Sequence, residues 1–430
     1  MTARAYRFDE GVRRHGDVLI GGSPLKLFRL TASGSQVVDR IRSGEAVAES
    51  GLVSSLIDAG AIHPCVPSTG RLTRADVTIV TPAFGPLDRH ADDVVVVDDG
   101  SEPPIPHATV RLDRNRGPGA ARNAGLVHVT TPLVAFVDAD VHLPDGWLVP
   151  LLPHFDDDRV ALVAPRVRSV AGTSALARYE SGRSPLDLGP TPGRVRAGTR
   201  ISYVPAAAVV CRADMIREIG GFDETLRFGE DVDLVWRLDE AGRRVRYEPA
   251  TVVTHDPRST WRDWFVQRVG YGSSAAPLSR RHRGALAPLR MSGWSIATWA
   301  SGVLVHPIVG GTIGAGSAAA LVGKLHDVPP RVAFVLAWRG NLDAGDQIGA
   351  AIRRVWWPIV VLASLRSPRA RRVLLLSATA AWHPVRVLDD VAYSVGVWRG
   401  VVRERTAAPL VPDISSWPGR RATPRRAGVR

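Results

Sequence analysis

The sequence predicts an α/β fold with a mostly parallel sheet, preceded by a small α/β unit and followed by a helical region. Short runs of β-branched residues recur between residues 77 and 137 and alternate with helical patterns that begin at glycine, which is typical of a parallel sheet covered on both faces. From Met291 to Gly323 the chain then carries no charged residue. At 430 residues with 45% hydrophobic content, the chain can build two or three packed units.

Residues 1–66 are expected to form the small α/β unit. The apolar run at 17–30 turns at a glycine pair and predicts two paired strands, and helical patterns follow at 36–41 and 50–59. Residues 67–76 then predict a linker. A small dimerisation element would show the same pattern, so these features leave the role of the unit open.

The sheet domain is expected over residues 77–290. Its first strands are predicted at Val77–Thr81, Val94–Val97, Thr109–Leu112 and Leu133–Val137. Only a short segment, GPLDRHADD, separates Phe84 from Val94, although a parallel crossover normally needs a dozen or more residues. Either the first two strands share an unusually tight connection, or a helix that would cover one face of the sheet is missing.

Two carboxylates and a Gly-Ser turn stand at the carboxyl end of the second strand, in VVVVDDGS at 94–101. In open parallel sheets nucleotides bind at this edge. We therefore expect Asp98 and Asp99 at the nucleotide, with Asp99 accepting the imide proton of a uracil base. Gly100 would allow the sharp turn that brings the base to the backbone. By itself, an Asp-Gly pair is also a common turn.

A glycine-rich segment, NRGPGAARNAGL at 115–126, is predicted to open a helix. Gly117 and Gly119 come just before that helix, so its first backbone amides would face an anionic group, and Arg122 adds a cation. This combination suits a diphosphate. The alternative is an amphipathic helix with a solvated Arg122, because a glycine-rich loop alone is a weak indicator.

The sharpest pattern is VAFVDAD at 134–140, a buried strand that ends in two acidic residues. Asp138 and Asp140 would project toward the same sheet edge, where hard cations take oxygen ligands. We expect Asp140 to bind a Mg²⁺ or Mn²⁺ ion held on the sugar-nucleotide diphosphate, and Asp138 to hold the ribose hydroxyls or share the ion. The metal would offset charge on the departing nucleotide. Taken alone, such a triplet also occurs by chance in surface loops.

Acidic residues also open a predicted helix in FGEDVDLVWRL at 228–238, which has an apolar stripe at helical spacing. Transfer to a hydroxyl needs a general base, and Asp231, with Glu230 beside it, is the predicted catalytic residue. Capping of the helix by its acidic residues is the alternative. A strand at 245–253 then leads to His255, a candidate further metal ligand, although a lone histidine is more often structural.

The last part of the chain is expected to be helical and apolar over 291–406, followed by a disordered basic tail at 407–430. The uncharged stretch Met291–Gly323 is long enough to cross a bilayer. Two shorter apolar stretches, 355–365 and 373–385, are flanked by arginine and tryptophan, which suits a membrane interface. A soluble helical domain with glycine-rich packing explains the same pattern.

The net charge of +13 could indicate an anionic partner. Lysine occurs only at Lys26 and Lys324 while arginine abounds, a bias that a GC-rich genome produces, and no nucleic-acid partner is expected. Cys65 and Cys211 build neither a disulfide framework nor a zinc site. No apolar run follows the charged residues at 1–16, so a cytoplasmic location is expected, with or without association with the inner face of the cell membrane.

Taken in order, VVVVDDGS, the glycine-rich loop with ARNAG, VAFVDAD, GGFDE, FGEDVDLVWRL and VVTH resemble the family-2 glycosyltransferases of GT-A fold. The resemblance implies a Rossmann-like domain that performs metal-dependent, inverting, single-displacement transfer from a UDP-sugar. The residues that it implies are Asp99 at uracil, Asp138 at ribose or metal, Asp140 and His255 at the metal, and Asp231 as the base.

The N-terminal motif GG-x-P-x-x-L-x-R-L resembles the winged-helix peptide-binding domains of the pyrroloquinoline-quinone D type. Together with the catalytic motifs and YGSSAAPLSRRH at 271–282, it makes the chain similar to the mycofactocin-system glycosyltransferases. This similarity implies UDP-glucose as donor and, as acceptor, a mycofactocin precursor peptide, its modified product or its growing β-1,4-glucan chain. Two alternatives stay open: transfer to a cell-envelope lipid or polysaccharide, and a peptide-binding scaffold with a degenerate transferase domain.

Overall fold

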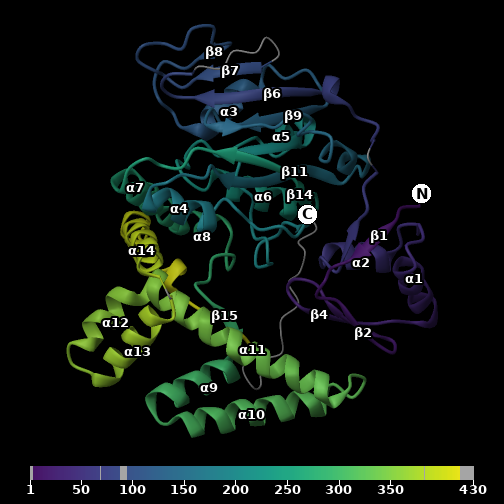
Figure 1. The fold of residues 1–430 in the computed structure, drawn as a ribbon, viewed down its shortest axis with the longest axis vertical. Coiled ribbons are helices and arrows are strands. Elements are labelled where there is room, and N and C mark those ends of the chain that lie inside the picture. Colours follow the sequence, from purple (N-terminus) through teal and green to yellow (C-terminus); the bar gives the residue numbers. More distant parts are fainter. Residues whose placement is uncertain (1–2, 68, 88–93, 382, 417–430) are drawn as a thin grey trace. The chain divides into compact units, whose positions relative to one another are not determined.

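The computed structural model describes residues 3–67, 69–87, 94–381 and 383–416. The chain divides into two compact units, Met1–Asp263 and Trp264–Arg430. The first unit holds the N-terminal domain and the large sheet, and the second holds the C-terminal helices (Figure 1). The mixed α/β architecture, with a large and mostly parallel sheet and a helical C-terminal region, confirms the fold class predicted from the sequence.

The N-terminal domain is a small α/β unit whose helices begin at hydroxyl caps. Thr31 accepts a hydrogen bond from Gly34 N at 3.2 Å at the start of α1, and Ser50 accepts one from Val53 N at 3.3 Å at the start of α2. The predicted hairpin is present as β3 and β4, with β2 paired to β3. The elements are β1 (Tyr6–Phe8), β2 (Arg13–His15), β3 (Val18–Gly21), β4 (Lys26–Arg29), α1 (Ala32–Arg42), α2 (Gly51–Asp58) and β5 (Ile62–Pro64).

The large sheet has the strand order β10-β14-β11-β13-β9-β6-β7-β8, with β12 paired to β14. Strands β9, β6, β7 and β8 run parallel, as do β11 and β14, whereas β13 is antiparallel to both of its neighbours. The strands are β6 (Val77–Ala83), β7 (Val94–Asp98), β8 (Val110–Arg111), β9 (Leu133–Val137), β10 (Val141–His142), β11 (Val160–Ser169), β12 (Gly193–Arg194), β13 (Ala208–Arg212) and β14 (Arg244–His255).

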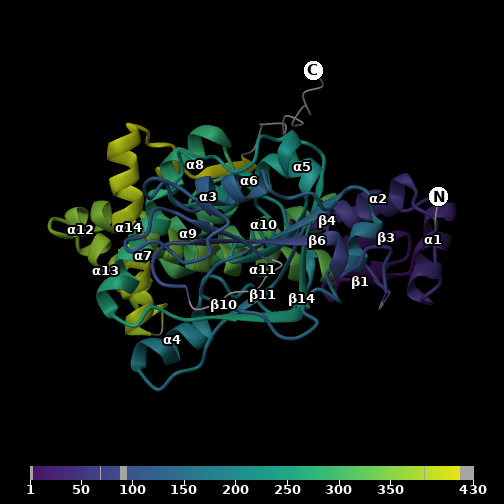
Figure 2. The same cartoon turned by 90° about the horizontal axis from the view of Figure 1, so that it is seen from above.

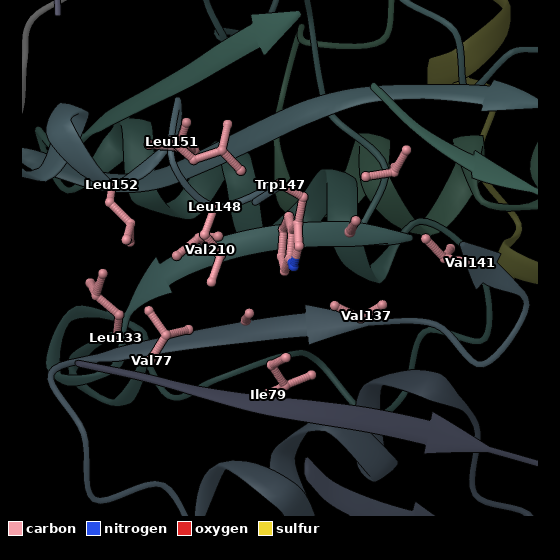
Figure 3. Close-up of a cluster of buried hydrophobic side chains, with 14 of the residues drawn as sticks. Val77, Ile79, Leu133, Val137, Val141, Trp147, Leu148, Leu151, Leu152 and Val210 are labelled. Atoms are coloured by element: carbon pink, nitrogen blue, oxygen red, sulfur yellow. The ribbon is translucent and has the colours of Figure 1, made fainter. Parts of the chain in front are cut away.

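Helices α3, α5 and α6 lie together on one side of this sheet (Figure 2). Successive side chains of a strand point to opposite faces, so β9 packs on two layers. Leu133 and Val137 join the core around Trp147 (Figure 3), whereas Phe136 meets Phe222 edge-on at 5.2 Å between ring centroids. The helices are α3 (Pro118–Leu126), α4 (Ala175–Arg183), α5 (Ala213–Glu218) and α6 (Glu230–Glu240), with short 3-10 turns η1 (Arg74–Asp76) and η2 (Leu152–Asp156).

The short connection between the first two strands of the sheet joins parallel neighbours. Ile79 lies opposite Val94 and Ala83 opposite Asp98 in the β6–β7 register. Residues 84–87 of the connection are not helical, and residues 88–93 lie outside the described residues. The tight connection considered from the sequence therefore joins two strands that still pair side by side.

The second unit is built from helices packed through glycine. A Cβ at Gly272 of α7 would lie 1.9 Å from the carbonyl oxygen of Tyr393, so α7 and α14 approach at backbone distance. The elements are α7 (Trp261–Ser273), α8 (Ala275–Arg281), β15 (Arg290–Ser292), α9 (Gly293–Leu304), α10 (Pro307–Lys324), α11 (Pro330–Ala351), the π-helical turn η3 (Ile352–Trp356), α12 (Trp357–Ser364), α13 (Pro368–Thr379), α14 (Pro384–Glu404), η4 (Ala408–Leu410) and β16 (Asp413–Ser416).

The uncharged stretch Met291–Gly323 does not form one long helix. α9 ends at Leu304 and α10 begins at Pro307, because a proline starts a helix but does not continue one. Within the described residues, no helix combines the length and the apolar character needed to cross a membrane. The sequence left open whether this stretch enters a bilayer, and the structure divides it between two helices.

The beginning of the predicted disordered tail is ordered. β16 pairs in parallel with β15, with Met291 opposite Ile414, and the turn η4 precedes it. Backbone pairing thus orders a segment that its composition did not distinguish from the basic tail. Residues 417–430 lie outside the described residues.

Candidate active site

Arg122 of α3 lies at the centre of the candidate active site. The residue is 3% exposed, and its guanidinium donates to Glu230 Oε1 at 2.8 Å and to Asp138 Oδ1 at 2.7 Å. Burial opposes the charged form, but the two carboxylates raise the pKa of Arg122, which stays charged. The structure gives Arg122 two carboxylate partners, and its expected contact with a diphosphate stays a prediction.

The backbone just before β13 connects Asp231 with Asp138. Ala206 N donates to Asp231 Oδ2 at 3.3 Å, and Asp138 N donates to Ala207 O at 2.8 Å. Gly229 precedes α6 with a φ of 81°, a left-handed conformation that glycine adopts without strain. The start of α6 therefore lies at the sheet edge where β9 ends.

Two carboxyl groups of this cluster, those of Glu230 and Asp231, resist ionisation. Burial raises the pKa of Glu230 to about 7, and the charge of Asp231 acts in the same direction. Burial also raises the pKa of Asp231; the amide of Val232 and the charge of Arg122 oppose this, and the charge of Asp138 adds to it. A carboxylate with a raised pKa is a stronger proton acceptor once it is ionised, which suits a general base.

Asp140 follows the end of β9, two residues after Asp138, and nearby charges change its pKa. Burial and then the charge of Asp138 raise the pKa of Asp140, while Arg258 and His255 lower it. Strand β10 pairs with β14 so that Val141 lies opposite His255, which brings this histidine next to the aspartate pair. Residues more than a hundred positions apart in the chain thus meet at one edge.

Both ring nitrogens of His255 already have partners. Nε2 lies 3.0 Å from Ser169 Oγ, and Nδ1 lies 3.1 Å from the carbonyl oxygen of Asp256. The side chain is 8% exposed. A role as metal ligand would require one of these contacts to open, because a metal takes the lone pair of an imidazole nitrogen.

The aspartate pair fits an ion that is shared with a substrate rather than one held by the protein alone. Among the residues that the structure describes, no group of three or more His, Cys, Asp and Glu side chains could hold a metal ion. Mg²⁺ is usually bound by one or two carboxylates together with substrate phosphates and water. Asp138 and Asp140 supply that number of carboxylates at one strand end.

Asp99 organises the glycine-rich loop that leads into α3. Its Oδ1 accepts a hydrogen bond from Arg116 N at 2.7 Å and its Oδ2 accepts one from Gly117 N at 2.8 Å. Gly100 turns the chain with a φ of 75°, and a Cβ there would lie 2.5 Å from the backbone of Arg114. The carboxylate that the sequence placed at uracil therefore also anchors the loop expected at the diphosphate.

Asp98 supports the same turn from inside the protein. Its side chain is fully buried, Oδ1 accepts from Ser101 N at 2.8 Å, and Oδ2 accepts from Ile105 N at 3.2 Å. Arg111 donates to the same carboxylate. Asp98 thus holds the loop after β7 from within the fold, and its expected contact with the nucleotide stays a prediction.

Comparison with known proteins identifies the class of chemistry. Residues 87–220 match the family model described as glycosyl transferase family 2. The chain is 40% identical to the pre-mycofactocin glycosyltransferase of Mycobacterium tuberculosis (strain ATCC 25618 / H37Rv), over 95% of this chain and 97% of that protein. The chain belongs to the pre-mycofactocin glycosyltransferase family. It is therefore a family-2 glycosyltransferase, as its ordered motifs indicated.

Other relatives of this glycosyltransferase share only part of it. A succinoglycan biosynthesis protein of Rhizobium meliloti (strain 1021) is 30% identical over 36% of this chain and 51% of that protein. A mannosyltransferase from Pyrobaculum calidifontis, solved with GDP-Man and Mn²⁺, aligns at 16% identity over 76% of this chain and 87% of that chain, with a TM-score of 0.40.

Two residues near the site of this glycosyltransferase were not predicted from the sequence. Arg258 is exposed in the segment after β14, and its charge acts on Asp140. Ala206 contributes its amide to Asp231 and its carbonyl oxygen to Arg122, at 3.3 Å and 3.5 Å. A lone arginine after a strand and one alanine in a run of alanines carry no sequence signal, so only the coordinates could reveal them.

Proposed function

We propose that this glycosyltransferase transfers glucose from UDP-glucose to a mycofactocin precursor with inversion at the sugar, and extends the product into an oligoglucose chain. The similarity to the pre-mycofactocin glycosyltransferase of Mycobacterium tuberculosis, which extends over 95% of this chain, supports a peptide-derived acceptor. The observation that carries the proposal is the clustering of Asp231 with Asp138 around Arg122, which puts a proton acceptor beside the strand-end aspartates.

In the proposed reaction Asp231 is the general base. An acceptor hydroxyl oxygen forms a bond to the anomeric carbon of glucose, its proton passes to the Asp231 carboxylate, and the bond from that carbon to the diphosphate oxygen breaks. Attack opposite the leaving group inverts the sugar. The raised pKa of Asp231 supports this role, because it makes the ionised carboxylate a better acceptor for the proton.

The donor end of the proposed site centres on the end of β9. Asp138 and Asp140, with His255 as a further ligand, would hold a Mg²⁺ or Mn²⁺ ion, which when bound offsets charge on the leaving UDP. Arg258 is close enough for its charge to act on Asp140, and in this proposal it would supply positive charge for the diphosphate. Asp99 would meet the uracil base while its oxygens keep the glycine-rich loop in place.

The acceptor in this proposal is recognised by the N-terminal domain. β2 and β4 are the outer strands of the three-stranded sheet, and an extended peptide can add to such an edge through backbone hydrogen bonds. Arg244 of β14 donates to Glu49 Oε1 at 3.1 Å and ties this domain to the large sheet. A peptide on the N-terminal domain would thus stay near the transferase site during successive transfers.

Release of UDP from UDP-glucose in the presence of Mn²⁺ and the mycofactocin precursor tests the proposal, with mass spectrometry of the peptide product. Each glucose transferred should add one hexose, and anomeric analysis should show the β configuration. UDP-galactose and UDP-N-acetylglucosamine serve as donor controls. Turnover with a lipid extract but not with the peptide would contradict the proposed acceptor. Binding of UDP without turnover on any acceptor would contradict the proposed transfer reaction.

A further inference from the structure

Two neighbouring helical hairpins of the second unit expose apolar side chains at their turns. α9 and α10 form one hairpin and α12 and α13 the other, and α13 contacts α9 (Figure 1). We call the exposed residues at and beside the two turns the hairpin tips. Their exposed fractions are Leu304 45%, Val305 72%, Ile308 69%, Val309 39%, Leu362 65% and Leu365 66%. Leu375 and Leu376, further along α13, are also exposed, at 64% and 58%.

These side chains do not serve the packing of the unit. The residues that α10 buries are Gly310, Gly314 and Ala318, on the face opposite its exposed apolar residues. Single exposed leucines are common, but contiguous exposed apolar groups on adjacent turns indicate a surface that meets another apolar phase.

The charged residues beside the hairpin tips are basic. Arg366, Arg369, Arg371 and Arg372 follow the α12–α13 turn and are exposed. Arg371 donates from Nε to Ser364 O at 2.8 Å and from Nη2 to Leu365 O at 3.5 Å, so this exposed cation is held directly at the α12–α13 turn. No aspartate or glutamate occurs in residues 264–326 or 347–388, which contain both hairpins. The surface is therefore apolar at its tips and cationic beside them.

We infer that the hairpin tips insert into the interface of an anionic lipid bilayer and hold the glycosyltransferase on the membrane surface. No helix among the described residues could cross a bilayer, so the attachment is to one leaflet only. Apolar side chains at the acyl boundary and arginines at the headgroups are the arrangement of interfacial helices. A second copy of the chain fits less well, because a two-fold contact would bring like-charged arginines together.

Vesicle flotation of the full chain tests this inference. Binding should be strong on phosphatidylcholine vesicles that contain phosphatidylglycerol, weak on phosphatidylcholine alone, and reduced by salt, since salt screens the arginines. Leu362→Ser with Leu365→Ser should abolish flotation. Arg369→Gln with Arg372→Gln should weaken binding to the anionic vesicles by roughly fivefold for each arginine replaced.

Val127→Ser is the matched apolar control, because this residue is 78% exposed on the first unit and should leave flotation unchanged. Release of UDP with a soluble acceptor should be the same for all of these variants. The membrane inference can therefore fail in the flotation experiment while the proposed function stands. Equal binding to both vesicle types would overturn the inference. So would a concentration-dependent dimer that Leu362→Ser with Leu365→Ser dissociates, if vesicles fail to float the protein.

Discussion

The guanidinium of Arg122 donates to Glu230 Oε1 at 2.8 Å, which joins helix α3 to helix α6 across 108 positions of sequence. The same guanidinium reaches Asp138 at the end of β9. A buried arginine between two carboxylates keeps this acidic cluster together, because removal of the cation would leave like charges unpaired in a poorly solvated space.

Arg122→Met should therefore lower the free energy of unfolding by about 3–5 kcal/mol, the range for breaking a buried ion pair. Urea denaturation followed by circular dichroism measures this change. Arg116→Met is the matched control, since Arg116 is half exposed and pairs with Glu224 at the surface, where such pairs contribute less than about 1 kcal/mol. Equal losses for both variants would argue against a special role for the buried arginine.

Asp231→Asn should lower kcat by about 10²–10⁴-fold, the usual contribution of a general base. UDP affinity, measured by calorimetry, should stay close to that of the wild type, because Asp231 faces the acceptor in the proposed mechanism. Asp214→Asn is the matched control: it also lies in the first turn of a helix and is exposed. If UDP binding and turnover were lost together, the base assignment would fail.

The pH dependence of turnover should show an acid limb above the range of an ordinary aspartate. Burial raises the pKa of Asp231, so the base becomes protonated and inactive as pH falls through that raised value. The charge of Asp138 adds to this rise, so Asp138→Asn, which removes that charge, should move the limb to lower pH. Profiles of kcat against pH for both proteins measure this. A limb that stays fixed in the variant would show that Asp138 does not act on the base.

Asp140→Asn should raise the concentration of Mn²⁺ needed for half-maximal turnover, because one of two carboxylates would be lost from the proposed ion. EDTA should stop turnover and added Mn²⁺ should restore it. Asp145→Asn, a few residues further along the chain, is a control that should leave the Mn²⁺ titration unchanged. Full turnover of the wild type in EDTA would contradict metal dependence.

Arg244→Met should loosen the N-terminal domain from the large sheet. Arg244 is 3% exposed and binds Asp157 at 2.7 Å and Glu49 at 3.1 Å, and Glu49 belongs to the N-terminal domain. Limited proteolysis should cleave the linker at 67–76 faster in this variant. Arg243→Met is the adjacent control, since Arg243 forms only a more exposed pair with Glu218. Unchanged cleavage in Arg244→Met would show that other contacts hold the domain.

The sequence alone was sufficient to predict the strands that end in acidic motifs. β-branched runs at β7 and β9 favour the extended backbone, and the acidic residues that follow them must lie at the sheet edge when the strands are parallel. The helices at the N-terminus were equally predictable, because Thr31 and Ser50 cap them locally. Local backbone preference decides all of these features.

The partners of each charged side chain were not predictable in the same way. Asp98 and Asp99 are neighbours in sequence, yet Asp98 is enclosed by its own loop and Asp99 binds the start of α3. The break between α9 and α10 likewise depends on packing that hydropathy does not describe.

By itself, the sequence determined the family, the strand-end carboxylates and the acidic start of α6, since these follow from motif order and backbone propensity. The tertiary structure decided that Arg122 pairs with Asp138 and Glu230 inside the protein, and that Ala206 holds Asp231. It also decided that the apolar stretch folds back as a hairpin. The reason is that desolvation and pairing of charges depend on distances between segments far apart in the chain, which no local pattern contains.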